Sequence, residues 1–440
     1  MSKYVLKMKT PALKFILTAS TAILSGFYAL AQVTPEALLR ENLDRAACHF
    51  HSYEYIPAAE TPAPEGYKAF YVNHYGRHGS RRSTNWYAET GYYNIKKAKK
   101  AGILTPLGEE LYNDVSKIYA EHVDMVGELS ERGAREHRAI AERLYWRYPE
   151  IFNGERTEVD ARASTVQRCI ISMAHFTSSL DDCAPALKFD FRTGKKHWRI
   201  INHEYYDRKS ISKYCEQVKD SVIRAMMDPA RFMNSIIKAD PDGVVGDPYA
   251  FMESIFTTGA ISQCLDYPAD VLGKYFTFDE VLAEYCSYNS RMYADMSNSL
   301  EFGDNVIWAP AQGLAQDFIE RGDAAISRDS KRAADLRFGH DTGILPFAGL
   351  LGLEGVSLRR RSGDISDYWS SSMMIPMATN LQMVYFRNDK DDILVKIYYN
   401  ERETKIDGLD AVTGPYYRWD DLKAWINSRI DEVNARINNR

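Results

Sequence analysis

The sequence predicts an α/β protein with a three-layer core, in which helices flank a mainly parallel central sheet, and with an inserted all-helical cap subdomain. Three short strand-like runs, at 69–72, 158–164 and 333–338, each end in a polar junction that carries a charged or reactive side chain. Open α/β folds place their ligand sites at such strand ends. Between about 206 and 305 the chain has Met- and Tyr-rich helical segments separated by Pro- and Gly-containing turns, which favours an all-helical insertion.

Capping residues and prolines mark the helix boundaries. Thr34 is suited to cap a first helix, Thr105 before Pro106 opens another, and Pro149 stops a long amphipathic helix. The segment 84–101 is rich in Tyr and Lys without a clean period, so a loop with partial helix is expected there. The helices expected in the core are 35–47, one that begins at 105, 134–148, 166–180, 345–353 and 419–434.

The remaining strands and the domain boundaries follow from this order. The runs 381–387 and 393–399 predict an antiparallel pair joined by a turn. We expect a signal peptide over 1–31, an α/β core made of 32–205 and 325–440, and a helical cap over 206–324. The acidic segment 240–247 lacks the ligand positions and the distal Glu of a calcium loop.

The first residues have the pattern of a secretory leader. Four lysines precede the apolar run 15–28, and Ala29-Leu30-Ala31 offers a small-x-small cleavage site. The run is too short for a comfortable membrane span, and Gln32 stands where a lipoprotein would have Cys. We therefore expect a periplasmic or secreted protein with no stable membrane insertion after cleavage.

Charge and cysteine content restrict the classes of partner. The leader carries four lysines and no acidic residue, so its removal takes the formal net charge from −5 to −9. An acidic chain argues against nucleic-acid binding. Six cysteines in an exported chain permit disulfides, with Cys264–Cys286 as the favoured pair. The run Cys48-His49-Phe50-His51 lacks a second ligand pair at suitable spacing, so no metal site is expected.

Arg77-His78-Gly79-Ser80-Arg81 follows the first strand. Arginine suits bidentate phosphate recognition, and two guanidinium groups favour the neutral, nucleophilic form of the imidazole between them. Taken alone, the motif also fits a solvated loop.

The other two junctions supply what a phosphoryl-transfer site needs besides a nucleophile. Arg162 and Arg168 flank a strand-to-helix junction, where backbone N–H groups and the helix dipole favour an anion. His340 and Asp341 stand at the third strand end. A neutral His nucleophile needs cations around the phosphoryl oxygens and an acid for the leaving alcohol, and these side chains could supply both.

Together the three motifs resemble those of the histidine acid phosphatases, the branch of the histidine phosphatase superfamily that includes phytases and multiple inositol polyphosphate phosphatases. Residues 77–84 look like the family signature RHGxRxPT, with Ser83 in place of Pro. Residues 338–342 are similar to its late His-Asp motif, and 162–168 resemble the segment with its further phosphate-binding arginine. The matches occur in family order.

The resemblance implies a role for each site residue. His78 would be the nucleophile that becomes phosphohistidine, and Asp341 would protonate the leaving oxygen and then assist water. Arg168 is the further arginine by position, with Arg162 as the second candidate. The residues that would bind the phosphoryl group are Arg77, Arg81, Arg168 and His340. No metal or organic cofactor is implied, and activity should favour acidic to neutral pH.

The substrate is a small phosphorylated molecule whose subgroup stays open. Many inositol polyphosphate phosphatases of the family carry His-Ala-Glu in place of the His-Asp motif, so phytate-like substrates and general organic phosphomonoesters both fit. Basic residues for a polyphosphate could come from Arg82 and the lysines of 96–100, which equally fit a solvated basic loop. A catalytically weak phosphate- or inositol-phosphate-binding homologue is the alternative, although binding alone would not require Asp341. A phosphoglycerate-mutase-like enzyme fits poorly with a signal peptide.

Overall fold

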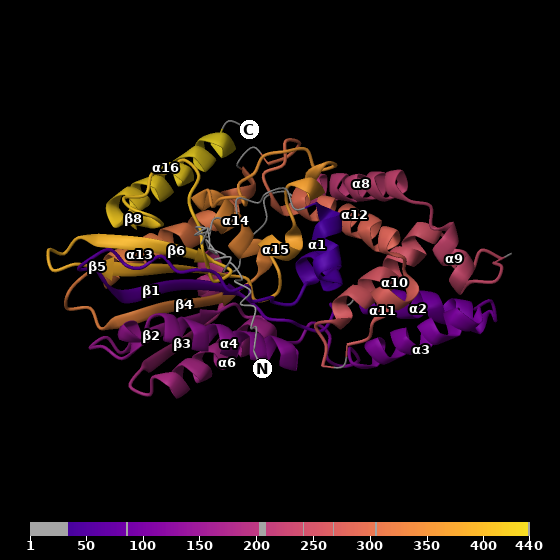
Figure 1. Ribbon diagram of the computed structural model, residues 1–440, viewed down its shortest axis with the longest axis horizontal. Helices are drawn as coiled ribbons and strands as arrows, with labels where there is room; N and C mark the ends of the chain where they lie inside the picture. Colours follow the sequence, from indigo (N-terminus) through magenta and orange to yellow (C-terminus); the bar gives the residue numbers. More distant parts are fainter. Residues whose placement is uncertain are drawn as a thin grey trace, which may run out of the picture.

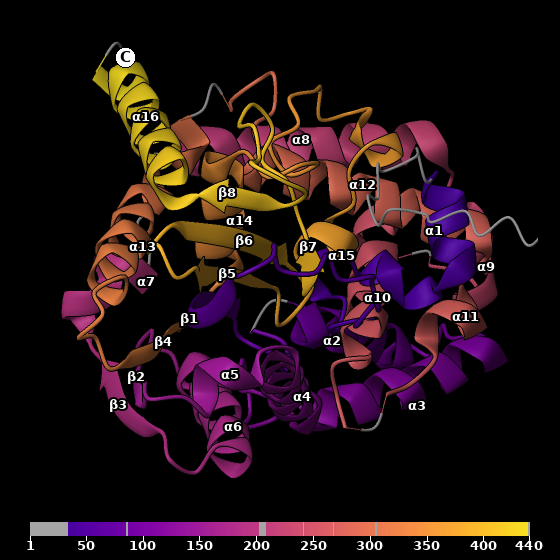
Figure 2. The same cartoon turned by 60° about the vertical axis from the view of Figure 1, so that its left-hand side comes forward.

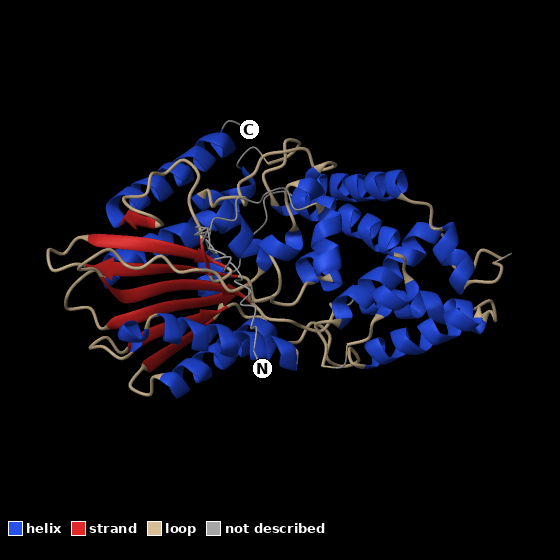
Figure 3. Cartoon of the chain, in the orientation of Figure 1, coloured by secondary structure: helices blue, strands red, loops and turns tan. Residues whose placement is uncertain are grey.

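The computed structural model describes residues 34–84, 87–201, 208–240, 242–266, 268–303 and 306–438. The expected signal peptide, 1–31, lies outside these ranges. A sheet with its flanking helices occupies one end of the molecule, and helices without strands occupy the other (Figure 3). Within the described ranges, none of the helices has the length and apolar character needed to cross a membrane.

The sheet has eight strands in the order β3-β2-β4-β1-β5-β6-β7, with β8 paired to β6. The strands are β1 (Lys68–Arg77), β2 (Glu158–Ala163), β3 (Lys188–Thr193), β4 (Arg332–Gly339), β5 (Asn380–Arg387), β6 (Ile393–Tyr399), β7 (Arg402–Glu403) and β8 (Tyr416–Arg418). β1 pairs with β4, and β2 pairs with both β4 and β3, all in parallel. This confirms the prediction for the three strands with apolar runs, β1, β2 and β4. β5 and β6 form the predicted antiparallel pair, and β5 joins β1 antiparallel. The sequence pattern missed β3, an edge strand whose mostly exposed side chains give no apolar signal.

Helices cover both faces of the sheet, so the three-layer prediction is confirmed. α4 (Glu131–Arg147), α5 (Pro149–Phe152) and α6 (Gln167–Cys183) lie on one side (Figure 2). Their apolar residues pack with those of the sheet in one buried cluster, for example Leu144, Phe176 and Phe338. α13 (Gln312–Ala325), α14 (Asp341–Leu351) and α16 (Trp419–Asn438) contact the strands from the other side (Figure 1). The buried cluster on that side continues into the helical end of the molecule.

The helical end contains more of the N-terminal half than the sequence predicts. Its helices are α2 (Tyr87–Lys100), α3 (Pro106–Ala120), α8 (Arg208–Met226), α9 (Ala230–Ile236), α10 (Pro248–Ser262), α11 (Val271–Tyr275) and α12 (Phe278–Met296). The expectation of a loop with partial helix over 84–101 underestimates the helix, because α2 spans Tyr87–Lys100 and packs against α3 and α10. Ile95 and Ala98 are fully buried in that contact, and they are too few among Tyr and Lys to show a period in the sequence. The cap boundaries 206 and 324 stay a prediction, and α13, inside that range, packs against β1 and β4.

Two helix ends are set by the signals in the sequence, and one helix is shorter than predicted. The Thr34 hydroxyl accepts from Ala37 N at 3.2 Å, but α1 spans only Pro35–Glu41. A 3₁₀ helix, Leu43–Phe50, follows after the extended residue Asn42 (φ −151°) and contains Cys48 at φ 54°. α4 ends at Arg147, and the next short helix begins at Pro149, as the proline predicts.

The predicted disulfide between Cys264 and Cys286 is wrong: all six cysteines are free. The Cys264 thiol donates instead to the Phe50 carbonyl at 3.1 Å, near the end of α10. Cys286 lies on α12, where burial raises the pKa of its thiol to about 11. Sequence spacing alone carries no information on this pairing.

Candidate active site

The predicted site residues gather at the carboxyl ends of β1 and β4. Arg77 and Gly339 are register partners in this parallel pair, so His78 and His340 follow at the same level. From β1 the chain continues into α2, so this edge of the sheet faces the helical end of the molecule (Figure 1). This is where parallel strands of α/β proteins place their ligands.

The backbone of His78 is held on both sides by neighbouring strands. Its N–H donates to the Gly339 carbonyl at 2.9 Å, and its own carbonyl accepts from Ala378 N at 2.9 Å. The side chain is buried, and Nδ1 lies 3.0 Å from the Gly79 carbonyl oxygen. Because a carbonyl oxygen only accepts, Nδ1 carries the proton and Nε2 keeps its lone pair.

The charge around His78 favours this neutral form. Burial lowers the pKa of His78 well below its usual value, and the positive charges of Arg168, Arg77 and Arg81 lower it further. The three arginines predicted to bind phosphate therefore all act on the predicted nucleophile.

Arg77, which precedes the predicted nucleophile His78, is hydrogen-bonded to the predicted acid, Asp341. Its Nη1 donates to the carbonyls of His49 (2.7 Å) and Ile375 (2.6 Å), and its Nη2 donates to Asp341 Oδ2 at 2.9 Å. The other carboxylate oxygen of Asp341 accepts from Thr342 N at 2.9 Å. Burial raises the pKa of Asp341, but the charges of Arg77, His49 and His340 outweigh this and leave the pKa below its usual range.

Arg81 and Arg168 supply the remaining cations. Arg81 is buried and donates to the Arg82 carbonyl at 3.0 Å. Burial, followed by repulsion from Arg168 and Arg77, lowers its pKa to about 10. Arg168 lies in the first turn of α6 and donates to the Gly127 carbonyl at 3.2 Å. The repulsion from Arg168 and Arg77 that lowers the pKa of Arg81 marks a place where an anion would be stabilised.

His340 completes the group from the third strand end. Its ring centroid lies 5.6 Å from that of His78. Its Nε2 is 3.1 Å from the Ser164 hydroxyl, at the junction of β2 and α6. The three strand-end motifs recognised in the sequence thus meet at one place.

Arg162, the second candidate for the further arginine, has a different environment. Its Nε lies 2.6 Å from Asp160 Oδ1, and its Nη1 lies 3.4 Å from Asp317 Oδ1, all among buried side chains. Two carboxylates therefore neutralise Arg162 beneath the sheet edge, whereas Arg168 is the arginine whose charge acts most strongly on His78.

Three of the basic residues considered for a polyphosphate substrate already have partners. Arg82 binds Asp266 at 3.0 Å. Lys96 lies 4.8 Å from the ring centroid of Tyr92, and Lys99 binds Glu109 on α3. These contacts favour the interpretation of 96–100 as a solvated basic face.

Sequence reasoning missed Glu136 and His49. Glu136, on α4, accepts from Ser80 N at 2.7 Å and from the Ser80 hydroxyl at 2.6 Å. His49 offers its carbonyl to Arg77, and burial lowers the pKa of its ring well below the usual value. A charged residue on an amphipathic helix looks solvated in the sequence, so Glu136 gave no signal. In the described ranges, no group of three or more His, Cys, Asp or Glu side chains could hold a metal ion, the run at 48–51 included.

Comparisons with known proteins agree with this geometry. The family model described as "Histidine phosphatase superfamily (branch 2)" matches residues 72–400. The multiple inositol polyphosphate phosphatase of Bifidobacterium longum, in complex with inositol hexasulfate, is 17% identical, with a TM-score of 0.69 over 88% of this chain and 98% of that one. The phytase of D. castellii is 14% identical (TM-score 0.69, 89% and 86% covered). The apo phytase of Hafnia alvei is 12% identical (TM-score 0.53, 84% and 99% covered).

No curated protein sequence matches the chain. The family match nevertheless spans all three motifs, from β1 through β4 and on to β6, and the solved structures share the fold. The chain belongs to branch 2 of the histidine phosphatase superfamily and is a histidine acid phosphatase.

Proposed function

We propose that this phosphatase is exported and hydrolyses phosphomonoesters through a phosphohistidine on His78. The observation that carries the proposal is the hydrogen bond from Arg77 to Asp341, which ties the strand end with the nucleophile to the strand end with the acid. The proposed phosphate ligands around this pair are Arg77, Arg81, Arg168 and His340.

The first step transfers the phosphoryl group to the enzyme. The Nε2 lone pair of His78 attacks phosphorus, the P–O bond to the alcohol breaks, and Asp341 gives its proton to the alcohol oxygen. In the second step, water attacks phosphorus while the Asp341 carboxylate takes a proton from it. The N–P bond breaks, its electron pair returns to Nε2, and phosphate is released.

The low pKa of Asp341 requires an account of how it becomes an acid. The charge of Arg77 keeps it ionised in the ligand-free site. A phosphate group among the arginines offsets their positive charge and adds a negative one, and both changes raise the pKa of a carboxyl. Substrate binding therefore raises the pKa of Asp341, the residue that protonates the leaving group. Because the protonated carboxyl is needed, the activity should be highest at acidic to neutral pH.

Inositol polyphosphates such as phytate, or general organic phosphomonoesters, are the proposed substrates. The first class is supported by the structural neighbours, which include phytases and a multiple inositol polyphosphate phosphatase. That phosphatase binds inositol hexasulfate, and the Hafnia alvei phytase binds myo-inositol hexakis sulphate. Export to the periplasm or medium is proposed from the leader pattern of 1–31.

The test is hydrolysis of a chromogenic phosphomonoester by the chain from Gln32 onward and by its His78→Ala and Asp341→Asn variants. We expect phosphate release by the wild type and loss of turnover in His78→Ala. Equal release by both would refute the proposed function. Binding of phosphate without hydrolysis by the wild type would instead identify a binding homologue. A panel of phytate, sugar phosphates and nucleotides then separates the two substrate classes.

A further inference from the structure

We propose that Glu136 is a positioning residue of the phosphatase reaction, which holds the loop carrying His78 and Arg81 in its reactive shape. The inference rests on the proposed function and adds a residue to it. The charge of Glu136 acts on Arg77, but the hydrogen bonds of its carboxylate go to Ser80 and Tyr53. Glu136 acts through Ser80, which lies between the nucleophile and one of the proposed phosphate ligands.

Three donors converge on the Glu136 carboxylate. Oε2 accepts from Ser80 N at 2.7 Å, and Oε1 accepts from the Ser80 hydroxyl at 2.6 Å and from Tyr53 N at 3.0 Å. The carboxylate is buried. Hydrogen bonds to an ionised group are among the stronger ones, and leaving their donors unpaired in the interior is costly.

The carbonyl of Ser80 is bound by the same helix. It accepts from both the N–H and the hydroxyl of Ser130, the N-cap of α4, each at 3.0 Å. Every polar atom of Ser80 is therefore paired with α4. The backbones of the loop and of α4 also approach each other so closely that no side chain fits between them. A Cβ on Gly133 would lie 2.2 Å from the Ser80 carbonyl oxygen, and one on Gly79 would lie 2.6 Å from the Gly133 carbonyl oxygen.

This arrangement turns the loop amides away from the phosphate site. Ser80 N–H points to Glu136, and Gly79 N–H donates to the Ser172 hydroxyl at 3.1 Å. Recognition of the phosphoryl group is thereby left to side chains. The orientation of the His78 and Arg81 side chains then depends on the backbone conformation of residues 78–81. Glu136 holds this conformation through its hydrogen bonds to Ser80.

A carboxylate is required here because its two oxygens serve two backbone N–H groups. In Glu136→Gln, the amide oxygen can accept from Ser80 N or from Tyr53 N, and the amide NH₂ faces the other one, donor against donor. Burial raises the pKa of Glu136, so a neutral side chain of the same shape is compatible with this interior. Glu136→Gln should therefore fold and yet displace the loop.

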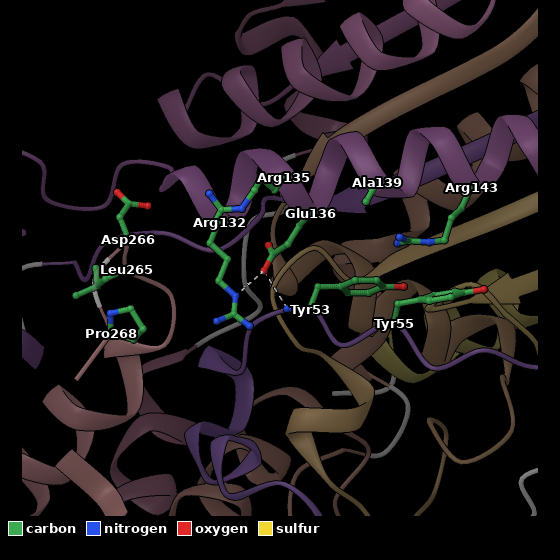
Figure 4. Close-up of a pocket in the computed structure, with 10 residues that line it drawn as sticks. All are labelled: Tyr53, Tyr55, Arg132, Arg135, Glu136, Ala139, Arg143, Leu265, Asp266 and Pro268. Atoms are coloured by element: carbon green, nitrogen blue, oxygen red, sulfur yellow. Dashed lines mark hydrogen bonds and ion pairs between the residues drawn. The ribbon is translucent and has the colours of Figure 1, made fainter. Parts of the chain in front are cut away.

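The far side of the carboxylate is open to small molecules. Glu136 lines a cavity of about 450 Å³ between α4, the segment at 53–55, and the residues Leu265, Asp266 and Pro268 (Figure 4). Arg132, Arg135 and Arg143 also line it, and Arg132 Nε lies 3.9 Å from Glu136 Oε1. A small carboxylate from solution can enter this arginine-lined space and occupy the position vacated in a Glu136→Ala variant.

The experiment compares Glu136→Ala and Glu136→Gln with the wild type on a chromogenic phosphomonoester. Glu142→Ala is the matched control, because Glu142 is exposed on the same helix and accepts from the Ser179 hydroxyl at 3.1 Å, away from the loop that carries His78. We expect kcat to fall about 100-fold in both Glu136 variants, the scale of a 1 Å misplacement of reacting groups, while Glu142→Ala keeps the wild-type kcat. Sodium formate should restore activity to Glu136→Ala in a saturable manner, and sodium chloride of equal ionic strength should not.

A double-mutant cycle tests whether the effect passes through Ser80. Ser80→Ala added to Glu136→Ala should cost less than it does alone, because the shared contact is already lost. Wild-type kcat in Glu136→Gln would overturn the inference, and so would a loss in Glu136→Ala that formate does not reverse at a temperature where circular dichroism shows native helix content. If Glu136→Ala does not fold, Glu136→Gln decides alone. Equal rates for the wild type and His78→Ala would refute the proposed function itself.

Discussion

His74 and His137 pack against the same aromatic ring: each imidazole centroid lies 5.6 Å from the centroid of Phe338. His74 is on β1 and His137 on α4, and both are 1% exposed. Among the residues that the structure describes, neither ring nitrogen of His74 has a hydrogen-bond partner. Burial lowers the pKa of both to about 3. The layer between the nucleophile strand and its covering helix therefore contains two imidazoles that must stay neutral.

We expect this pair to make the protein lose stability in acid. Below the pKa of a histidine in the unfolded chain, about 6.5, the unfolded state binds a proton that the folded state refuses until pH is near 3. The free energy of unfolding therefore falls as pH falls through this window, by about 2 kcal/mol per histidine at pH 5. Urea unfolding at pH 7 and pH 5 measures it. His74→Leu should show a smaller drop than the wild type, and identical drops would contradict the prediction.

Replacing Arg162 and replacing Arg168 should have opposite consequences. Arg162→Ala removes a cation from buried Asp160 and Asp317, and breaking such a pair costs about 3 kcal/mol of stability. Arg168→Ala removes a group that stabilises charge at the phosphoryl centre, for which a loss of about 10² to 10³ in kcat is expected. Thermal unfolding and steady-state kinetics of both variants test this. The assignment of the further phosphate ligand to Arg168 fails if Arg162→Ala is the variant that is stable and inactive.

Inorganic phosphate should stabilise the protein against heat. The positive charge of Arg168 repels those of Arg77 and Arg81, and the charge of Arg77 also repels that of Arg81. An anion between these guanidinium groups relieves the repulsion. Phosphate at 100 times its dissociation constant adds about 2.7 kcal/mol to the free energy of unfolding. The rise in Tm should exceed that in sodium chloride of equal ionic strength, and it should shrink in Arg168→Ala. Arg138→Ala, an exposed arginine that contacts His175, should respond like the wild type, and a shift that survives in Arg168→Ala would speak against this site.

Asp341→Asn should discriminate between leaving groups. The variant cannot protonate the departing oxygen, so alkyl phosphates should lose about 10² to 10⁴ in kcat/KM, the range of general acid catalysis. An aryl phosphate with an acidic phenol needs little protonation and should lose less. The proposed mechanism uses the protonated form of Asp341, so it predicts that the wild-type rate on alkyl phosphates declines from neutral toward alkaline pH. A profile that rises steadily to alkaline pH would contradict the role of Asp341.

The apolar runs in the sequence predict where three buried strands lie, and for β2 and β4 they also predict where the strand ends. β1 instead continues to Arg77, beyond the predicted run at 69–72. The parallel neighbours β1, β2 and β4 were predicted in this way. The sequence favoured Arg168 over Arg162 by its position in the motif, but the ion pair that occupies Arg162 could not be predicted, since Asp317 belongs to the distant helix α13. The same limit applies to Glu136, whose burial arises only when the loop at 78–81 is laid on α4.

The two backbone hydrogen bonds of His78 also determine how much of the chain must be folded before the enzyme can be active. The nucleophile's peptide is held by Gly339 from β4 on one side and by Ala378, just before β5, on the other. A nascent chain that has folded only as far as β4 holds this peptide on one side alone. Catalysis should therefore begin only after β5 has paired with β1, so that chains lacking β5 do not hydrolyse phosphate esters.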